Sequence, residues 1–490
     1  MPDALVLAID QGTSSTKCLL VDGTGLVVRA ATAPVAIHYP QPGWVEQDAA
    51  DILDSVLIAA ARCLDGIDRD AVIAVGFSTQ RESALAWDPV TGKPTGPVLG
   101  WQDQRSRPIC DGLREAGHAG TIREISGLPL DPMFSAAKIR WLLDRSPGAA
   151  VGTVDAWLLA ALTGAHQIEI GNASRTQLLD VRTGTWSADL LGLFGVPEQA
   201  LPALTPSVGD LGRIGDQGGV LAGLPVRAVL GDSHAALYAH GTQASGGAKV
   251  TYGTGTSVMA LLDGTTVDDT AVCLTIAWGD PGLRLAAEGN IRSSGATIAW
   301  LGELLGLNPG RIAELAADAG SDGVHLVPGF GGLAAPWWDD AAVGLISGLT
   351  LGTRAPQLAR AALESVAHQV TDVVDAMGPV RHLLADGGAS ANDTLMQIQA
   401  DLSGIPVRRA RAGNLSALGA AHLAGREAGL WGDAGSTRPL TYDDFTPRLD
   451  AGTADAHRSA WRAAVNRALT TTTMPSNQPM SLPNKGVDLT

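Results

Sequence analysis

Near its N-terminus the chain reads ALVLAIDQGTSSTKCLLVDGTGLVVRA over residues 4–30, where apolar runs alternate with glycine turns. Residues 4–9 and 18–21 have the composition of short strands, and a polar glycine turn separates them. The Asp-Gly and Thr-Gly pairs at residues 22–25 favour a further hairpin before residues 26–30. The segment therefore predicts paired strands that begin an α/β unit.

The same theme returns halfway along the chain. Residues 249–252 read as a strand, residues 253–256 as a glycine turn, and residues 257–262 as a second strand. Strands at 71–77 and 226–230 and a helix capped by Asp48 fall between the two occurrences. Because strands alternate with helices in each half, we predict a duplicated α/β architecture with a boundary near residue 243.

Composition narrows the class of protein. The chain has 490 residues and a net charge of −16, which disfavours nucleic acid or an anionic membrane as a partner. The length predicts two or three domains, and no apolar run reaches the roughly 18 residues of a membrane span. Four scattered cysteines without a CxxC pair suit reduced thiols. We therefore expect a cytoplasmic globular protein without a targeting segment.

The first glycine turn, residues 10–15, is a candidate phosphate site. Successive backbone N–H groups and hydroxyls in such a turn form an anion nest. Asp10 could hold a hydrated Mg²⁺, since that ion keeps most of its waters, and Lys17 is close enough to reach a terminal phosphoryl group. An ordinary hairpin with an Asx turn explains the same residues equally well.

Two further glycine segments could bind a nucleotide. Residues 252–257 (YGTGTS) repeat the first turn in the second half, and residues 386–392 (DGGASAN) follow an apolar strand at 383–385. Glycine at a strand end lets a flat ligand approach the backbone, and a following helix N-terminus favours phosphate oxygens. Taken singly, each segment is also consistent with a plain turn.

Charged residues at two strand ends could bind a hydroxylated substrate. Arg81 and Glu82 can hydrogen-bond vicinal hydroxyls, and Asp232 could accept a hydroxyl proton. The alternatives are a surface ion pair for the first two and a helix N-cap for Asp232. The chain contains no HExxH, P-loop, Rossmann GxGxxG or GxSxG motif, so those chemistries have no support.

Together these segments resemble the FGGY family of carbohydrate kinases, and glycerol kinases most. The likeness runs from residue 7 to about 450 and rests on ordered matches along that length. These are YPQPGWVEQD (39–48), STQRES (78–83), DPMFSAAKIRWLLD (131–144), APWWDDAAVG (335–344), GLISGLTLGT (344–353), ARAALESVAHQVTDV (359–373) and DGGASANDTLMQIQADL (386–402).

The resemblance implies a fold, cofactors and a set of site residues. The fold would be two actin-like, ribonuclease-H-like domains around an active-site cleft, using ATP and Mg²⁺. Residues 1–243 would bind the sugar, 244–450 the nucleotide, and 451–490 would form a C-terminal helix and mobile tail. By the same likeness, a dimer or tetramer is expected. The implied nucleotide contacts are Gly12, Thr13, Ser14, Lys17, Thr254, Gly255, Gly295, Gly388 and Asn392. The implied polyol contacts are Arg81, Glu82, Trp101 and Asp232, with Asp232 as catalytic base.

Four positions depart from the glycerol kinase pattern. Met133 replaces a tyrosine that hydrogen-bonds the polyol, Ser233 replaces a glutamine, and Ser257 replaces a phenylalanine. Ala299 replaces a glutamine on the nucleotide side. Since these changes remove polar partners and open volume, they favour a tetritol, pentitol or ketopentose over glycerol. A true glycerol kinase, a chaperone-like ATPase and a sugar-binding regulator are the alternatives.

Overall fold

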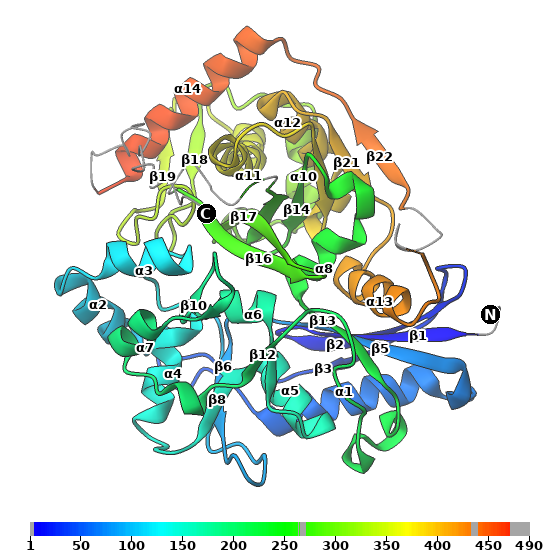
Figure 1. The fold of residues 1–490 in the computed structure, drawn as a ribbon. Coiled ribbons are helices and arrows are strands. Elements are labelled where there is room, and N and C mark those ends of the chain that lie inside the picture. The colour runs from blue at the N-terminus through cyan, green and yellow to red at the C-terminus, as the bar shows by residue number, and fades with distance from the viewer. Residues whose placement is uncertain (1–3, 263, 265–270, 433–439, 471–490) are drawn as a thin grey trace, which may run out of the picture.

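The computed structural model describes residues 4–262, 264, 271–432 and 440–470 (Figure 1). Two mixed sheets organise the chain, one from each half, and helices pack around both. The part of the predicted tail beyond Thr470 lies outside the described residues. Within those ranges, none of the helices has both the length and the apolar character needed to cross a membrane.

The first sheet has the strand order β13-β5-β1-β2-β3. Its strands are β1 (Leu5–Gln11), β2 (Ser15–Asp22), β3 (Val27–Pro34), β5 (Val72–Thr79) and β13 (Val226–Gly231). β1, β5 and β13 are parallel to one another. β2 runs antiparallel to its two neighbours, β1 and β3. The hairpins predicted within residues 4–30 and the strands predicted at residues 71–77 and 226–230 are therefore confirmed. Helix α1 (Ala49–Leu64) packs on this sheet, and its predicted N-cap is also confirmed, because the Asp48 side chain accepts a hydrogen bond from the Ala50 N–H.

The second sheet has the order β16-β17-β15-β14-β20-β21-β22. Its strands are β14 (Gly247–Tyr252), β15 (Thr256–Leu261), β16 (Cys273–Gly279), β17 (Leu283–Ile291), β20 (His382–Asp386), β21 (Val407–Ala410) and β22 (Tyr442–Phe445). β14, β20 and β21 are parallel, as β1, β5 and β13 are. β15 and β17 continue antiparallel from β14, as β2 and β3 do from β1. Five strands of the second sheet thus repeat the order and directions of the first, which confirms the predicted duplication, and β16 and β22 are additions at its two edges.

The other elements surround these sheets. The remaining first-half helices are α2 (Arg107–Glu115), α3 (Ala119–Ser126), α4 (Ser135–Leu143), α5 (Val154–Thr163), α6 (Ile170–Ser174), α7 (Ala188–Phe194) and α8 (Asp232–Ala239). Those of the second half are α9 (Gly295–Leu305), α10 (Pro309–Ala317), α11 (Ala355–Met377), α12 (Asp393–Ser403), α13 (Leu415–Glu427) and α14 (Ala451–Ala468). The short strands are β4 (Glu46–Gln47), β6 (Ala84–Trp87), β7 (Val98–Leu99), β8 (Ala150–Thr153), β9 (Gln167–Glu169), β10 (Leu179–Asp180), β11 (Thr185–Trp186), β12 (Ala203–Thr205), β18 (His325–Val327) and β19 (Leu345–Ser347).

Helix α13 joins the two halves. Although it connects β21 to β22 of the second sheet, it lies against α8 and the first sheet (Figure 1). Two glycines permit this approach: a Cβ on Gly76 would lie 2.3 Å from the Ala420 carbonyl oxygen, and one on Gly419 would lie 1.8 Å from the Ala235 oxygen. The contact therefore requires glycine at both positions.

Buried apolar side chains pack around each sheet, and the cluster around the first sheet also includes Leu274, Ile276 and Leu285 from β16 and β17 of the second. The four cysteines are free and buried. Helix α14 packs against α12 and β18, and the Trp461 indole donates to Asp372 on α11 at 2.7 Å. The two halves therefore meet at β16 and β17 as well as at α8 and α13.

Candidate active site

The ends of three parallel strands bring the acidic candidates together. Asp10 pairs with Ser78 in the sheet register, and Ser78 pairs with Leu230, two residues before Asp232. The Ser78 hydroxyl donates to Asp10 at 2.8 Å. Burial and, to a smaller extent, the nearby Asp232 carboxylate raise the pKa of the Asp10 carboxyl to about 6, although the Ser78 hydrogen bond and Lys17 act to lower it.

The first glycine turn connects β1 to β2 as predicted. The Gly12 N–H donates to the Ser15 carbonyl at 3.0 Å, which closes the turn. Lys17 lies directly across the hairpin from Asp10. The Trp101 indole donates to the Thr13 hydroxyl at 3.1 Å. This contact links a residue expected at the polyol to one expected at a phosphate.

The second turn is held against the start of α9. The Gly295 N–H donates to the Gly253 carbonyl at 3.0 Å, and the Ser294 N–H donates to the Thr254 carbonyl at 3.0 Å. A Cβ on Gly255 would lie 2.5 Å from the Ile291 carbonyl oxygen, so this turn requires glycine there. The structure thus brings Gly295 next to the turn that contains Thr254 and Gly255, although Gly295 lies far along the chain from them.

A cavity of about 680 Å³ opens between the two halves. Asp10 and Lys17 line it from the first half, and the segments after β20 and β21 line it from the second. Gly388 is among the lining residues, whereas the other predicted phosphate contacts are not: Gly12, Thr13, Ser14, Thr254, Gly255 and Gly295. The Asn392 side chain instead accepts a hydrogen bond from the Leu395 N–H as the N-cap of α12. A cavity of this size suits a nucleotide-sized ligand.

The double glycine after β20 gives a contrast that tests this cavity. Gly387 has φ +88°, and a Cβ there would lie 2.5 Å from the Tyr252 carbonyl oxygen, whereas a Cβ on Gly388 meets no atom within 4 Å. We expect Gly388→Ile to weaken ADP binding about tenfold or more without loss of folding, because its side chain enters the cavity. Gly387→Ala should instead destabilise the fold by roughly 1–3 kcal/mol.

Calorimetric titration with ADP and thermal unfolding of both variants check this expectation. Gly388→Ala is the matched control, since a methyl group has room and should leave both readouts near wild type. Unchanged ADP affinity in Gly388→Ile would place the nucleotide elsewhere.

The substrate candidates form one ion-pair network. The Arg81 Nε lies 3.2 Å from Asp232, and its two Nη atoms lie 3.0 and 2.6 Å from Glu288. Arg175 contacts Glu82 through Nε at 2.6 Å and Glu288 through Nη1 at 2.8 Å. The charges alternate in sign along this chain of contacts. Arg81 and Glu82 are therefore not a surface pair, because both are buried and each is bound elsewhere.

Local backbone geometry supports this network. Glu82 has a φ of +60°, an uncommon value for a residue with a side chain, and such strain concentrates at functional sites. A Cβ on Gly231 would lie 2.5 Å from the Arg81 Cδ, so the glycine leaves room for the arginine stem. Asp232 is the first residue of α8, directly after the N-cap residue Gly231, and its side chain is 41% exposed. Its carboxylate accepts a hydrogen bond from the Ser233 N–H at 2.6 Å, so Asp232 lies in the first turn of the helix and not at the N-cap position.

Arg175 and Glu288 were not predicted from the sequence as residues of the site. Glu288 is the only charged residue in the buried part of β17, and a lone carboxylate among apolar strand residues signals a buried partner. Arg175 follows the short helix α6 and has no comparable local signal. Only the tertiary structure shows that both belong to the site.

Two of the positions that depart from glycerol kinases lie beside Asp232. The Ser233 hydroxyl lies 3.3 Å from that of Ser257, which in turn lies 3.5 Å from Glu288. Met133 packs in a small apolar cluster with Leu128 and Phe134. Ala299 lies separately on α9.

The side chains that could hold Mg²⁺ are carboxylates that line the larger cavity. No group of three or more His, Cys, Asp or Glu side chains able to hold a metal occurs in the ranges that the structure describes. Asp10 and Asp386 both line the cavity, and the Oδ2 of Asp386 has no hydrogen-bond partner. Since Mg²⁺ bound with a nucleotide needs only one or two carboxylates besides phosphates and waters, these residues fit the ion.

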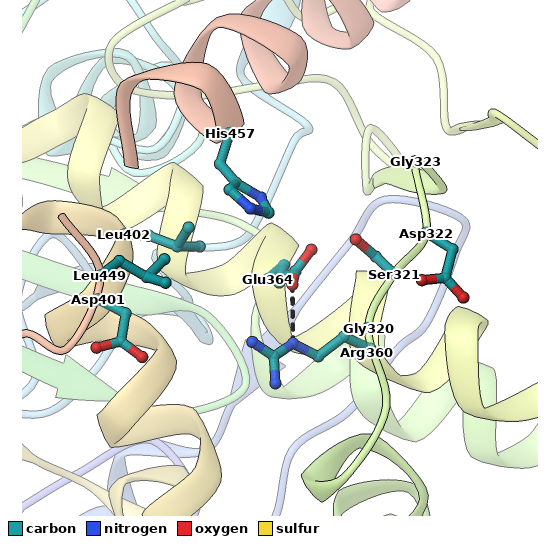
Figure 2. A pocket seen from close by; sticks show the side chains of 10 residues that line it. All are labelled: Gly320, Ser321, Asp322, Gly323, Arg360, Glu364, Asp401, Leu402, Leu449 and His457. Atoms are coloured by element: carbon teal, nitrogen blue, oxygen red, sulfur yellow. Dashed lines mark hydrogen bonds and ion pairs between the residues drawn. The ribbon is translucent and has the colours of Figure 1, made fainter. Parts of the chain in front are cut away.

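A second cavity, of about 380 Å³, lies between α11, α12, α14 and the loop at residues 320–323 (Figure 2). Figure 2 shows Arg360 bonded to Glu364 at its base and His457 above. None of the predicted site residues lines it. It is therefore separate from the candidate active site.

Comparison with known proteins assigns this arrangement to a class. Each half is an α/β unit with a glycine turn between its first two sheet strands, and the two units repeat one topology. The model "FGGY family of carbohydrate kinases, N-terminal domain" matches residues 5–239, and the corresponding C-terminal model matches residues 248–428. The chain therefore belongs to the FGGY family of carbohydrate kinases and is a sugar or polyol kinase.

Individual relatives carry different names. The chain is 41% identical to an apulose kinase of Pectobacterium atrosepticum, over 95% of this chain and 98% of that protein. It is 43% identical to a glycerol kinase of Aromatoleum aromaticum, over 94% and 98%. The solved structure of Plasmodium falciparum glycerol kinase with ADP superposes with a TM-score of 0.88 at 27% identity, over 96% of this chain and 99% of that one. A xylulose kinase of Lactobacillus acidophilus, at 21% identity and TM-score 0.87 over 95% and 98%, shows the shared fold.

Proposed function

We propose that the protein transfers the γ-phosphoryl group of ATP to a terminal hydroxyl of a four- or five-carbon polyol or ketose. The class of acceptor would be a tetritol, a pentitol or a ketopentose. The observation that carries this proposal is the pair Ser233 and Ser257 beside Asp232, where glycerol kinases carry a glutamine and a phenylalanine. Two small hydroxyl side chains leave room and polar contacts for a longer acceptor.

Asp232 is the proposed general base. Its Oδ1 accepts from the Ser233 N–H at 2.6 Å and from the Arg81 Nε at 3.2 Å, which fixes the carboxylate and leaves Oδ2 for the acceptor hydroxyl. Arg81, Glu82 and Trp101 orient the acceptor. The hydroxyl proton passes to Asp232 while the hydroxyl oxygen attacks the γ-phosphorus, and the bond between that phosphorus and the β–γ bridging oxygen breaks to release ADP. This transfer depends chiefly on positioning and electrostatics.

The nucleotide would occupy the 680 Å³ cavity. Its phosphates would lie between the two glycine turns: Gly12, Thr13, Ser14 and Lys17 on one side, and Thr254, Gly255 and Gly295 on the other. Gly388 and Asn392 would contact the adenosine. Mg²⁺, held through water by Asp10 when bound with the nucleotide, would neutralise phosphate charge. The solved glycerol kinase with ADP supports a nucleotide in this fold.

The family likeness leaves the acceptor open. A relative named for apulose and one named for glycerol are similarly close, at 41% and 43% identity. A glycerol kinase that makes sn-glycerol 3-phosphate is therefore the second candidate.

We also propose that residues 1–243 form the sugar-binding domain and residues 244–450 the nucleotide-binding domain. The protein would be a cytoplasmic dimer or tetramer.

Incubation with MgATP and a panel of C3 to C6 polyols and ketoses, with mass spectrometry of the products, tests the proposal. We expect one acceptor-dependent phosphorylated product from a C4 or C5 compound. ATP hydrolysis that is indifferent to every acceptor would indicate an ATPase, and acceptor binding without any product would indicate a regulator. Either result would contradict the proposal.

A further inference from the structure

A glutamate of the second half completes the acceptor side of the site. Glu288 lies on β17, yet its carboxylate contacts Arg81 and Arg175 of the first half at 2.6 to 3.0 Å. Its side chain is 0% exposed. Burial alone would raise the pKa of Glu288, but Arg175 and Arg81 outweigh burial and hold this pKa well below its usual value. Glu288 is therefore a charged group bound by two guanidinium groups in a dry environment.

The guanidinium group of Arg81 contacts two carboxylates, Glu288 and Asp232, through different nitrogen atoms. Both Nη atoms face Glu288, as in a bidentate pair, and only Nε is left for Asp232, at 3.2 Å. A bidentate contact is the stronger and more directional arrangement for a guanidinium group. Glu288 therefore occupies the arginine fork that could otherwise turn to Asp232. Asp232 keeps one lateral contact with Arg81 and stays partly exposed.

The same carboxylate also forms an ion pair with Arg175, without a hydrogen bond to either Nη atom. Arg175 is fully buried, and its Nε contacts Glu82 at 2.6 Å while Nη1 contacts Glu288 at 2.8 Å. Glu288 thus orders both side chains expected to hold the acceptor, Arg81 directly and Glu82 through Arg175. Ser257, one of the positions that depart from the glycerol kinase pattern, lies 3.5 Å from this carboxylate.

We propose that Glu288 is a positioning residue which holds the Arg81 fork away from Asp232 and so keeps the carboxylate of Asp232 available to the acceptor hydroxyl. This inference rests on the proposed function, because it assumes that the acceptor binds at Asp232. It implies that the acceptor site is complete only when the second half lies against the first.

The test replaces Glu288 by Gln and measures kcat and KM for the best acceptor, together with ADP affinity by calorimetry. We expect kcat/KM for the acceptor to fall about 100-fold, the order of loss that follows a misplacement of about 1 Å. ADP affinity should stay within about twofold, since Glu288 does not line the nucleotide cavity. Glu288→Asp should recover part of the turnover, because it restores the charge with a shorter reach.

Glu364→Gln is the matched control. Glu364 is a buried glutamate of the same half, paired with Arg360 at 2.8 Å beside the second cavity (Figure 2). We expect its kinetics to match the wild type, so loss of an ion pair alone would not explain a defect in Glu288→Gln. Turnover of Glu288→Gln within threefold of wild type would overturn the inference, as would an equal defect in Glu364→Gln or a parallel loss of ADP affinity.

Two additions keep the outcome decisive. If Glu288→Gln fails to fold, Glu288→Asp decides alone: we expect at least a tenfold loss of kcat/KM with unchanged ADP affinity, and wild-type kinetics would overturn the inference. Asp232→Asn is assayed alongside. An active Asp232→Asn refutes the base assigned in the proposed function, and with it the premise of this inference, whereas an inactive Asp232→Asn with a normal Glu288→Gln refutes only the positioning role.

Discussion

Replacement of Asp232 by Asn is expected to lower acceptor-dependent turnover by about 10³- to 10⁴-fold, because the amide cannot take the hydroxyl proton. The substitution is nearly isosteric, and its side-chain oxygen can still accept from the Ser233 N–H and the Arg81 Nε. ADP affinity should therefore remain close to wild type, since Asp232 does not line the nucleotide cavity.

Coupled measurement of ADP release, with and without acceptor, checks this expectation. Asp210→Asn is a suitable control, because Asp210 is an exposed aspartate. Its partner Arg227 lies on β13, the strand that leads into Asp232. Near-normal turnover of Asp232→Asn would exclude Asp232 as the base and would move the acceptor to another part of the network.

The second large effect is a change of acceptor in the triple variant Met133→Tyr, Ser233→Gln, Ser257→Phe. These substitutions restore the side chains that the glycerol kinase pattern carries at the three positions. We expect the ratio of kcat/KM for glycerol to that for the best C4 or C5 acceptor to rise by about 10²-fold or more, since polar contacts to a substrate hydroxyl discriminate strongly.

Ala299→Gln serves as the control for the triple variant. It restores the fourth departing residue, which lies on α9 and is expected on the nucleotide side. Acceptor preference should therefore not change in Ala299→Gln. A triple variant that folds and keeps the wild-type preference would show that these positions do not select the acceptor.

Local signals were sufficient to predict most of the framework. The glycine turns, the short apolar runs and the Asp48 cap each act over a few residues, so the sequence predicts the strands of both hairpins and the start of α1. The return of the strand–turn–strand theme after residue 243 predicted the duplication. The topology of the two sheets confirms it.

Contacts between distant segments could not be predicted in the same way. Glu288 meets Arg81 across more than two hundred residues, and only the packing of the two halves brings them together. Likewise, nothing in the sequence of α13 shows that it rests on the first sheet, because the close approach depends on Gly76 in another strand. Asp232 and its neighbours were predicted as candidates, whereas the network that orients them was not.

The most direct test of the proposed acceptor class is a comparison of kcat/KM for glycerol with kcat/KM for tetritols, pentitols, ketopentoses and apulose at saturating MgATP. The structure around Ser233 and Ser257 predicts that a C4 or C5 compound exceeds glycerol by about 10²-fold or more. If glycerol gave the highest kcat/KM, the proposed acceptor class would be wrong, and the protein would be a glycerol kinase with a rebuilt pocket.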